Sequence, residues 1–335
     1  MAESSPSKKL PAKKGLLHAF KQQKLRAWQP VLTPRWVISV FLVTGAVLLG
    51  VGGILYASAN SVKECVKDYS DPVSGQNSTF TNVTIKSSDC TGPDGSPSSL
   101  GSPVFVYYQL TNFYQNHRRY VKSRSDDQLR AGGQDVTDLS DCDPWEKNET
   151  SGKYFYPCGL IARSVFNDTF MLYKGDSEDQ IGVDTSAEAI TWETDRKEKF
   201  VQPDSFSDST LTKIDPWLST PDESELFPGG VSNGHFINWM RVAGLPSFRK
   251  LWGKIDSTVD LPVKVVVDNR YPVSSFGGSK KVVLSTASPL GGRNFFLAWC
   301  YFAAGGICVV LGLFFFGKQI RSPRALGDVN YLSWT

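Results

Sequence analysis

The sequence predicts a membrane protein: two transmembrane helices and a large lumenal or extracellular ectodomain of mainly antiparallel β-structure, sandwich-like, with short helices and long loops. Two observations place the spans and the ectodomain, namely two long uncharged apolar stretches and four glycosylation sequons confined to the region between them. A third, the presence of short β-branched runs in that region, predicts the strands. We expect a basic arm at 1–35, spans at 36–60 and 294–317, an ectodomain at 61–293 and a tail at 318–335.

The two apolar stretches, residues 36–62 and 294–317, contain no Asp, Glu, Lys or Arg. A hydrocarbon core about 30 Å thick needs about 20 apolar residues in a helix, and both stretches are longer. A cleaved signal peptide has an apolar region of only about 7–15 residues close to the start of the chain. We therefore expect the first stretch to be a signal anchor and the second to cross the membrane again.

Charge is distributed unevenly along the chain. Residues 1–35 carry eight Lys or Arg against the single acid Glu3, and the tail is also basic. By the positive-inside rule, both termini are predicted to be cytosolic. The region between the spans holds 25 basic and 31 acidic residues, a net charge of about −6. An acidic ectodomain gives no support to a nucleic-acid partner.

Four Asn-X-Ser/Thr sequons lie between the spans, with acceptors Asn77, Asn82, Asn148 and Asn167. Sequons that carry N-linked glycan belong to surfaces exposed in the secretory pathway. We therefore expect an integral membrane protein of the endoplasmic reticulum, Golgi, endosome or plasma membrane.

Six cysteines divide in the same way. Cys300 and Cys308 fall in the second span, which leaves four in an oxidising compartment, namely Cys65, Cys90, Cys142 and Cys158. Four cysteines allow three pairings, and proximity favours 65 with 90 and 142 with 158 because short loops cost little entropy to close. With no Cys-X-X-Cys or His-rich pattern, we expect no metal site.

Short runs rich in β-branched and aromatic residues predict strands at 104–108, 263–267 and 281–284, the last preceded by a hairpin turn at 277–280. Two segments rich in Ser, Gly, Pro and Asp, 91–103 and 203–234, are predicted to be long surface loops.

Helical spacing of apolar residues predicts two short helices, over 236–243 and 248–252, separated by the break Gly244-Leu245-Pro246. The aromatic residues of these helices are expected in the core. Arg241, Arg249 and Lys250 fall on other faces, which we expect to be solvated.

The sequence shows no catalytic motif. It lacks the Asp-Lys-Thr-Gly of a phosphorylated pump, a phosphate-binding loop and a Gly-X-Ser-X-Gly elbow. We therefore expect no catalytic residue and no cofactor, which favours an accessory subunit or a receptor-like protein. Two alternatives are a two-span ligand-gated channel subunit, disfavoured by only four lumenal cysteines and no polar stripe in the second span, and a doubly anchored lumenal hydrolase.

The first span has small residues one turn apart, in Ala46-X3-Gly50 and Gly53-X3-Ala57. This spacing is typical of helix faces that approach a partner helix closely in lipid.

The run from Tyr107 to Ser123, YYQLTNFYQNHRRYVKS, resembles the signature of the ligand-effect-modulator, or cell-division-control-fifty, family. Its members are the non-catalytic β-subunits of type IV P-type ATPase lipid flippases. Four more blocks resemble the family in order, at 20–34, 157–169, 236–253 and 269–294.

The resemblance implies a heterodimer in a membrane, with N-linked glycans. A type IV P-type ATPase performs the phosphoryl chemistry and moves phospholipid, while this chain supports its folding, its exit from the endoplasmic reticulum and its catalytic cycle. The matched blocks imply partner contacts at Phe20, Gln23, Trp28, Pro30, Asn112, Phe113, His117, Arg118, Arg119, Tyr120, Trp239, Arg241, Phe248 and Arg249.

Overall fold

The computed structural model describes residues 20–21, 23, 33–70, 80–93, 95–130, 138–202, 206, 212–219 and 221–323. The chain divides into two compact units, one made of Met1–Val51 with Cys300–Thr335 and the other of Gly52–Trp299.

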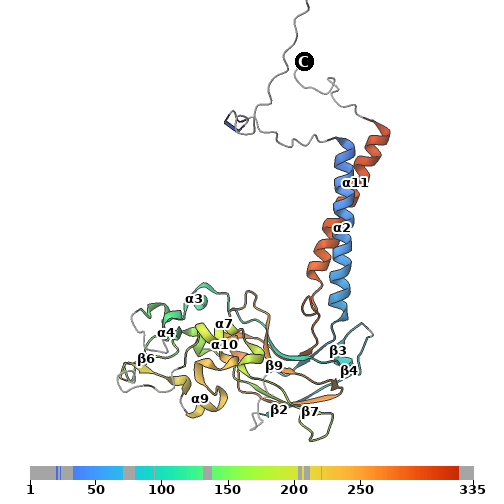
Figure 1. Cartoon of the computed structure of the whole chain (residues 1–335). Coiled ribbons are helices and arrows are strands. Elements are labelled where there is room, and N and C mark those ends of the chain that lie inside the picture. Colours follow the sequence, from blue (N-terminus) through green and yellow to red (C-terminus); the bar gives the residue numbers. More distant parts are fainter. Residues whose placement is uncertain are drawn as a thin grey trace, which may run out of the picture. The chain divides into compact units, whose positions relative to one another are not determined.

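Two long helices, α2 (Pro34–Ser61) and α11 (Phe296–Arg321), are coloured blue and red in Figure 1. They contain 28 and 26 residues. At 1.5 Å per residue each is about 40 Å long, which exceeds a hydrocarbon core of about 30 Å. Both are long and apolar enough to cross a membrane, so the two predicted apolar spans form the expected helices.

Glycines allow α2 and α11 to pack closely. A Cβ atom added to Gly45 would lie 2.7 Å from Val309 Cγ2 and 3.1 Å from the carbonyl oxygen of Gly305. The relation is reciprocal, since a Cβ added to Gly305 would lie 3.1 Å from the Gly45 carbonyl oxygen. Lipid provides no hydrophobic force between apolar helices, so contact at this range supplies much of their attraction.

The Gly52–Trp299 unit is built mainly on antiparallel strands, as predicted. A five-stranded sheet has the order β3-β1-β12-β5-β9. Its strands are β1 (Glu64–Asp68), β3 (Cys90–Thr91), β5 (Val104–Leu110), β9 (Phe248–Ile255) and β12 (Lys280–Ser285). A three-stranded sheet has the order β2-β11-β7, from β2 (Phe80–Ile85), β7 (Thr169–Lys174) and β11 (Val263–Asp268).

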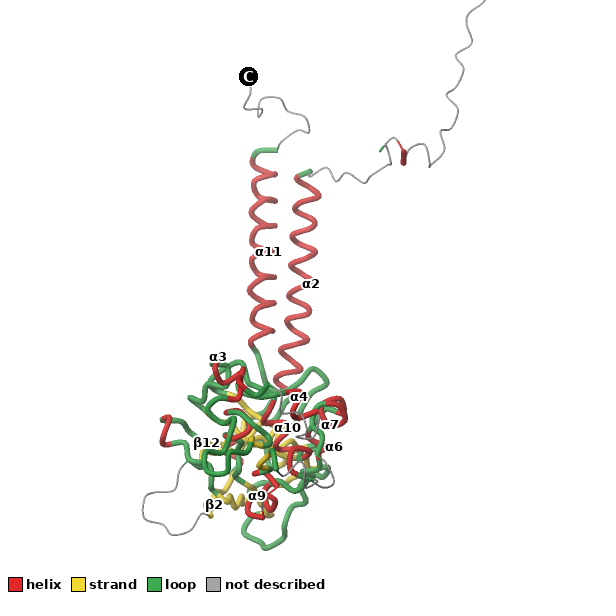
Figure 2. Tube along the Cα trace, turned by 90° about the vertical axis from the view of Figure 1, so that its left-hand side faces the viewer, coloured by secondary structure: helices red, strands yellow, loops and turns green. Residues whose placement is uncertain are grey.

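Two small strand pairs complete the β-structure of the described residues. The antiparallel pair is β4 (Ser99–Leu100) with β10 (Val259–Asp260), and the parallel pair is β6 (Tyr154–Phe155) with β8 (Ile214–Asp215). Figure 2 shows the short helices and loops gathered around the strands. These helices are α3 (Arg118–Lys122), α4 (Asp126–Arg130), α5 (Leu160–Arg163), α6 (Ala187–Ile190), α7 (Glu193–Glu198), α9 (Pro221–Leu226) and α10 (Gly234–Met240).

Alternation along the strands produces the core. In β5 every second residue, from Val104 to Leu110, is buried, because successive side chains of a strand point to opposite faces. Val106 of β5, Leu172 of β7 and Val265 of β11 belong to one hydrophobic cluster. The two large sheets therefore share a core, in agreement with the sandwich-like prediction.

The second predicted helix, over 248–252, is wrong. These residues begin β9, which pairs with β5 from Phe248 opposite Leu110 to Ile255 opposite Val104. The register shifts between Val106 and Tyr107, so one extra residue of β9 enters the ladder. Because of this irregularity, the consecutive residues Trp252 and Gly253 are both buried, and the alternation of buried and more exposed residues is interrupted there. Over 248–252 the alternation is regular, but Lys250 is polar on the buried face and Leu251 is apolar on the other, so the apolar residues Phe248, Leu251 and Trp252 take on a helix-like spacing.

The two predicted surface loops also need correction. The described part of 203–234 contains β8, the 3-10 turns Trp217–Ser219 and Gly230–Ser232, and α9. Trp217, Leu218, Phe227 and Val231 are at most 7% exposed, so this segment is anchored in the core. Segment 91–103 likewise contains β4, where Leu100 is fully buried. Both segments are polar in overall composition, so their few large, buried apolar residues were missed.

Candidate partner-binding surface

Two loops of the central domain, residues 112–117 and 241–247, lie against each other and form what we call the loop pair. Three hydrogen bonds join them: from Phe113 N to the Pro246 carbonyl at 3.0 Å, from Asn116 Nδ2 to the Gly244 carbonyl at 3.0 Å, and from Ala243 N to Gln115 Oε1 at 2.8 Å. The structure thus brings together two of the sequence blocks in which partner contacts were predicted.

Aromatic rings support the loop pair from beneath. The Phe113 ring lies 5.3–6.3 Å from the rings of Tyr120, Trp239, Phe248 and Phe276, measured between centroids. Trp239 is fully buried and Phe248 is 8% exposed. These two predicted contact residues therefore lie in the core, and any influence on a partner acts through the loop pair above them.

The first turn of the loop pair depends on Asn112. Its backbone adopts φ 58°, a left-handed conformation that Asn tolerates better than most residues. Its side-chain nitrogen donates a hydrogen bond to the Phe276 carbonyl, which holds the turn against the segment before β12. Tyr120 closes the other end, where its hydroxyl lies 2.7 Å from Ser164 Oγ.

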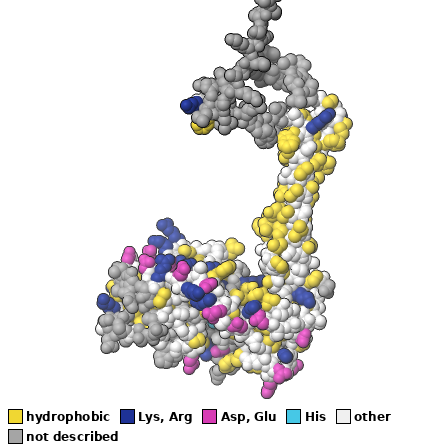
Figure 3. Space-filling model, in the orientation of Figure 1, with side chains coloured by type: hydrophobic (Ala, Val, Ile, Leu, Met, Phe, Trp, Pro, Cys, Tyr) yellow, Lys and Arg dark blue, Asp and Glu magenta, His cyan; other side chains and the backbone are white. Residues whose placement is uncertain are grey.

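The outer side of the loop pair carries exposed apolar and cationic side chains. Tyr114 is 57% exposed and Leu245 is 70% exposed. Sequence reasoning did not single out either residue. Arg118 and Arg119 are also exposed, at the start of α3, and Figure 3 shows Lys and Arg side chains gathered over this region.

The ion pairs of this region are open to water. Arg119 lies 2.9 Å from Asp143, and Lys122 lies 3.1 Å from Asp141, but every side chain is at least 60% exposed. Such pairs contribute little to stability because solvent screens them. Arg118 has no ion-pair partner among the described residues, and these cations remain accessible to a partner.

Arg241, at the start of the second loop, is held by a buried carboxylate. Its Nε donates a hydrogen bond to Asp195 Oδ2 at 2.6 Å, and Lys199 Nζ lies 2.6 Å from Asp195 Oδ1. Burial raises the pKa of Asp195, but the hydrogen bonds from Lys199 and Arg241 outweigh burial, and the pKa is lowered overall. The guanidinium also covers the ring of Trp192, which is 67% exposed.

Lys250, predicted on a solvated face, is instead 6% exposed beneath the same loop. Its Nζ donates to the carbonyls of Asn238 at 2.9 Å, Trp239 at 3.0 Å and Arg241. These are carbonyls at the end of α10, which have no partner within the helix. Burial lowers the pKa of Lys250 to about 7, and the nearby Arg241 acts in the same direction.

Arg249 belongs to a different face of the central domain. From β9 it reaches over the sheet to Gln109 on β5, at 2.8 Å, and forms two hydrogen bonds of 2.7 and 3.0 Å with the Glu64 carboxylate on β1. This predicted contact residue is engaged within the sheet and does not extend the loop pair.

The N-terminal contact predictions lie in the other unit. Phe20 is 67% exposed, and its carbonyl accepts a hydrogen bond from Gln23 N at 3.0 Å, where Gln23 has φ 52°. Trp28 and Pro30 lie outside the described residues.

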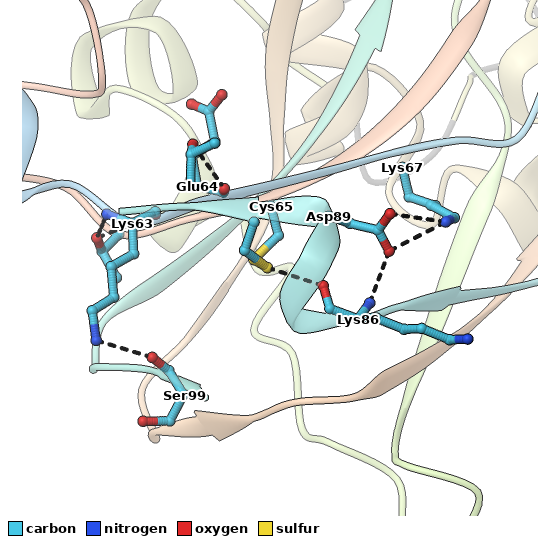
Figure 4. The surroundings of a disulfide bond; sticks show 10 residues. Lys63, Glu64, Cys65, Lys67, Lys86, Asp89 and Ser99 are labelled. Carbon is cyan, nitrogen blue, oxygen red and sulfur yellow. Dashed lines mark hydrogen bonds and ion pairs between the residues drawn. A yellow bond between two sulfur atoms is a disulfide. The ribbon is translucent and has the colours of Figure 1, made fainter. Parts of the chain in front are cut away.

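Both disulfides follow the pairing that proximity favoured, Cys65 with Cys90 and Cys142 with Cys158. The first joins β1 to β3, where the two cysteines face each other in register. Figure 4 shows its surroundings, in which Lys67 Nζ lies 3.0 Å from Asp89 and Lys63 Nζ donates to the Ser99 carbonyl at 3.2 Å.

The second disulfide lies next to the end of α3, where Ser123 Oγ donates a hydrogen bond to the Cys142 carbonyl at 3.4 Å. Gly159, next to Cys158, has φ 97°, and a Cβ atom there would lie only 2.1 Å from the Ser123 carbonyl oxygen. Ser123 Oγ in turn accepts a hydrogen bond from Leu160 N at 2.8 Å. A larger residue at position 159 would separate these segments.

A second buried lysine, Lys280, lies at the start of β12. Lys280 and Asp168 are both fully buried, 2.8 Å apart, and Lys280 Nζ also donates to Asn269 Oδ1 and the Tyr271 carbonyl. Asp168 accepts hydrogen bonds from Arg270 N at 2.7 Å and Tyr271 N at 2.6 Å. Burial raises the pKa of Asp168, although Lys280 and these hydrogen bonds oppose the shift.

Comparison with known proteins follows from these features. The model of the LEM3 (ligand-effect modulator 3) family / CDC50 family matches residues 55–325. The chain belongs to this family.

Relatives within the family match over nearly their full length. The chain is 39% identical to ALA-interacting subunit 3 of Arabidopsis thaliana over 327 residues, which cover 94% of this chain and 89% of the relative. It is 38% identical to cell cycle control protein 50A of Mus musculus, covering 93% and 91%. It is 30% identical to the phospholipid-transporting ATPase accessory subunit CDC50 of Chaetomium thermophilum, covering 94% and 90%.

The LEM3/CDC50 match includes the loop pair, both disulfides, all four sequons and α11, while Phe20 and Gln23 precede it. Of the sequons, Asn82 is exposed on β2, and Asn148 and Asn167 are partly buried. Asn77 lies outside the described residues. Glycan at these positions stays a prediction.

The small-residue face of α2 lies apart from its contact with α11. Gly50 and Gly53 are exposed, and a Cβ added to either would have nothing within 4 Å. Ala46 and Ala57 are exposed as well. Their spacing places all four on one side of the helix.

Proposed function

We propose that this chain is the accessory subunit of a phospholipid-transporting P-type ATPase and carries no catalytic activity of its own. The observation that carries the proposal is the match to a relative named as such an accessory subunit, over 94% of this chain and 90% of the relative. The ALA-interacting subunit of Arabidopsis thaliana, by its name, points to the same kind of partnership.

The loop pair is the ectodomain surface that fits this role best. Tyr114 and Leu245 supply an exposed apolar centre, and Arg118 and Arg119 supply a cationic rim. Interfaces commonly combine an apolar or aromatic anchor with a polar rim, and their energy is concentrated in a few residues. We infer that the loop pair binds lumenal loops of the ATPase that offer apolar and acidic side chains.

In the membrane, the face of α2 formed by Ala46, Gly50, Gly53 and Ala57 is the candidate contact with an ATPase helix. Its small residues let a partner backbone approach, as Gly45 and Gly305 do within this chain.

The proposed topology has both termini in the cytosol and a glycosylated ectodomain in the secretory lumen. The basic flanks of the two spans and the four sequons support it. In this arrangement the chain assists folding of the ATPase, its exit from the endoplasmic reticulum and its transport cycle.

Co-purification tests the proposal. The tagged full chain, solubilised in mild detergent, is expected to bring down a P-type ATPase at one-to-one stoichiometry. The double variant Tyr114→Ser/Leu245→Ser should reduce the amount of ATPase recovered without reducing the amount of this chain. Phe80→Ser, which removes an aromatic ring that is 51% exposed on β2, is the matched control. A homo-oligomer without ATPase would contradict the proposal.

Loss of the second disulfide gives an independent check. Cys142→Ser removes a cross-link worth roughly 2–4 kcal/mol and should lower the yield of complex. An unchanged yield would mean that α3 keeps its place without the disulfide.

A further inference from the structure

A small cavity lies behind the sequon at Asn167. Its volume is ≈ 20 Å³, and its walls include Tyr108, Phe166, Phe227 and Trp252, together with the side chains of Asn167 and His235. Asp168, Thr169 and Leu226 complete the lining, and among its polar residues Asn167 and His235 differ from Asp168, whose carboxylate is bound to Lys280.

Both polar side chains bury an atom that has no partner. Asn167 Oδ1 and His235 Nδ1 are buried, and neither has a hydrogen-bond partner among the groups that the structure describes. Buried polar atoms are rarely left in this condition, because each loses its bonds to water on folding. Two such atoms on the wall of one cavity call for a shared explanation.

His235 cannot turn away to find another partner. It lies in the first turn of α10, where the Asn233 side chain accepts hydrogen bonds from the backbone nitrogens of His235 and Phe236. Its ring stacks on Trp252 with the centroids 5.3 Å apart and the planes 24° apart. Burial lowers the pKa of His235 to about 4, so the ring is neutral near pH 7, with one nitrogen as donor and the other as acceptor.

Asn167 is fixed on both sides. Phe166 stacks on Tyr108 with centroids 3.8 Å apart, and Asp168 is the carboxylate bound to Lys280. With both neighbours anchored in the core, the backbone at Asn167 has little freedom to move its amide oxygen out of the cavity.

We propose that this cavity is a binding site for one ordered water molecule, which bridges Asn167 Oδ1 and His235 Nδ1. A cavity needs about 10–15 Å³ to hold a single water, so ≈ 20 Å³ accommodates one and not two. Water can donate to the amide oxygen and can either accept from or donate to the imidazole nitrogen. It therefore satisfies both atoms in either tautomer of His235.

The bridge would also orient the sequon. The oxygen and nitrogen of a planar amide diverge from Cγ, so an oxygen held inward turns the nitrogen away from the cavity. That nitrogen is the atom that carries an N-linked glycan. This consequence rests on the proposed glycosylation of Asn167, whereas the water site itself does not.

Two measurements on the purified full chain test the site. A density map at about 2 Å resolution should show one water between the two side chains. A double-mutant cycle should show coupling between them: His235→Phe keeps the ring stack but removes Nδ1, and Asn167→Leu keeps the shape but removes Oδ1. His235→Phe is expected to lower Tm by roughly 2–4 °C when Asn167 is present and by clearly less in the Asn167→Leu background.

Asn82→Leu provides the control, since it removes an exposed sequon on β2 and should leave the effect of His235→Phe unchanged. An equal effect of His235→Phe in all three backgrounds would overturn the proposal. A map that resolves other buried waters but shows none between Asn167 and His235 would also overturn the proposal. The map alone tests the water site if His235→Phe does not fold. Neither result depends on the ATPase partnership, provided that the chain can be purified.

Discussion

Two buried lysines stabilise different parts of the central domain through different chemistry. Lys280 is paired with the Asp168 carboxylate where β12 begins, and Asn269 and Tyr271 provide further acceptors. Lys250 donates its hydrogen bonds to backbone carbonyl oxygens at the end of α10 and lies over the rings of Trp239 and Phe248. A carboxylate neutralises a buried ammonium, whereas carbonyl dipoles only solvate it.

Because their partners differ, the two lysines should respond differently to substitution. Removal of Lys280 leaves a carboxylate that has no countercharge in the core. Removal of Lys250 leaves neutral carbonyls and at the same time relieves a charge that burial disfavours. We therefore expect the Lys280 site to be sensitive to substitution and the Lys250 site to be sensitive to pH.

The largest effect is expected for Lys280→Met. Breaking one partner of a buried ion pair costs about 3–5 kcal/mol, and we expect Tm of the detergent-solubilised chain to fall by roughly 10 °C. Thermal unfolding followed by tryptophan fluorescence measures this. Lys281→Met, one residue further along β12 and only partly buried, is the control and should change Tm little.

A neutral pair should restore part of that loss. Asp168→Asn has nearly the same shape, can still accept from a backbone N–H and keeps the sequon at Asn167 intact. The double variant Asp168→Asn/Lys280→Met should regain about half of the stability lost by Lys280→Met alone, because no buried charge remains. A further drop in Tm would show that the carboxylate is needed for its backbone hydrogen bonds rather than for the ion pair.

At the Lys250 site the sharper measurement is a pH series. The folded pKa of about 7 lies below the ordinary lysine pKa of 10.5, so the unfolded chain binds the proton more tightly. Stability should therefore rise with pH, by about 2 kcal/mol between pH 7 and pH 9, and reach its full value near the unfolded pKa. Lys250→Met should remove this slope, and the difference between the two chains isolates it from other titrations. Parallel curves would contradict the prediction.

The smallest effect is expected for Arg241→Gln. It removes the hydrogen bond to Asp195, but Lys199 still pairs with that carboxylate, so the loss should be about 1 kcal/mol. Its interest lies in the Arg241 carbonyl, which Lys250 binds. Arg241 also lowers the pKa of Lys250 through its charge, so its removal should raise that pKa and reduce the pH slope assigned to Lys250. Arg119→Gln, in an exposed pair, is the matched control and should leave Tm and the slope unchanged.

The sequence predicted the spans, the strands at 104–108, 263–267 and 281–284, and the disulfide pairing, because apolar length, alternation and short loops are local signals. It did not predict either buried lysine. Lys280 was expected in a turn and Lys250 on a solvated face, because acceptors such as Asp168 and the Trp239 carbonyl are supplied by other elements. The alternation of Phe248, Lys250 and Trp252 was the available signal, but a lysine on the buried face and the apolar Leu251 on the opposite face obscured it.

The sequence also predicted the candidate surface only in part. The family signature pointed to residues 112–120 and 239–249, and the structure joins the two loops through Phe113 and Pro246. It also separates Trp239, Phe248 and Arg249 from the exposed set, a distinction that requires knowledge of burial. Tyr114 and Leu245 lie within these two blocks, but nothing in the sequence separates them from neighbouring apolar residues that are buried, because exposed apolar residues are common on protein surfaces.

The position of β12 limits the order in which the central domain can assemble during synthesis. β12 is the last strand to be made, yet it lies at the centre of the five-stranded sheet, between β1 and β5. Both disulfides close loops that are complete long before β12 leaves the ribosome. Until then β1 and β5 each present an unpaired edge, of the kind that other chains can join. A chain truncated before residue 280 would therefore keep its cross-links and lack its central strand.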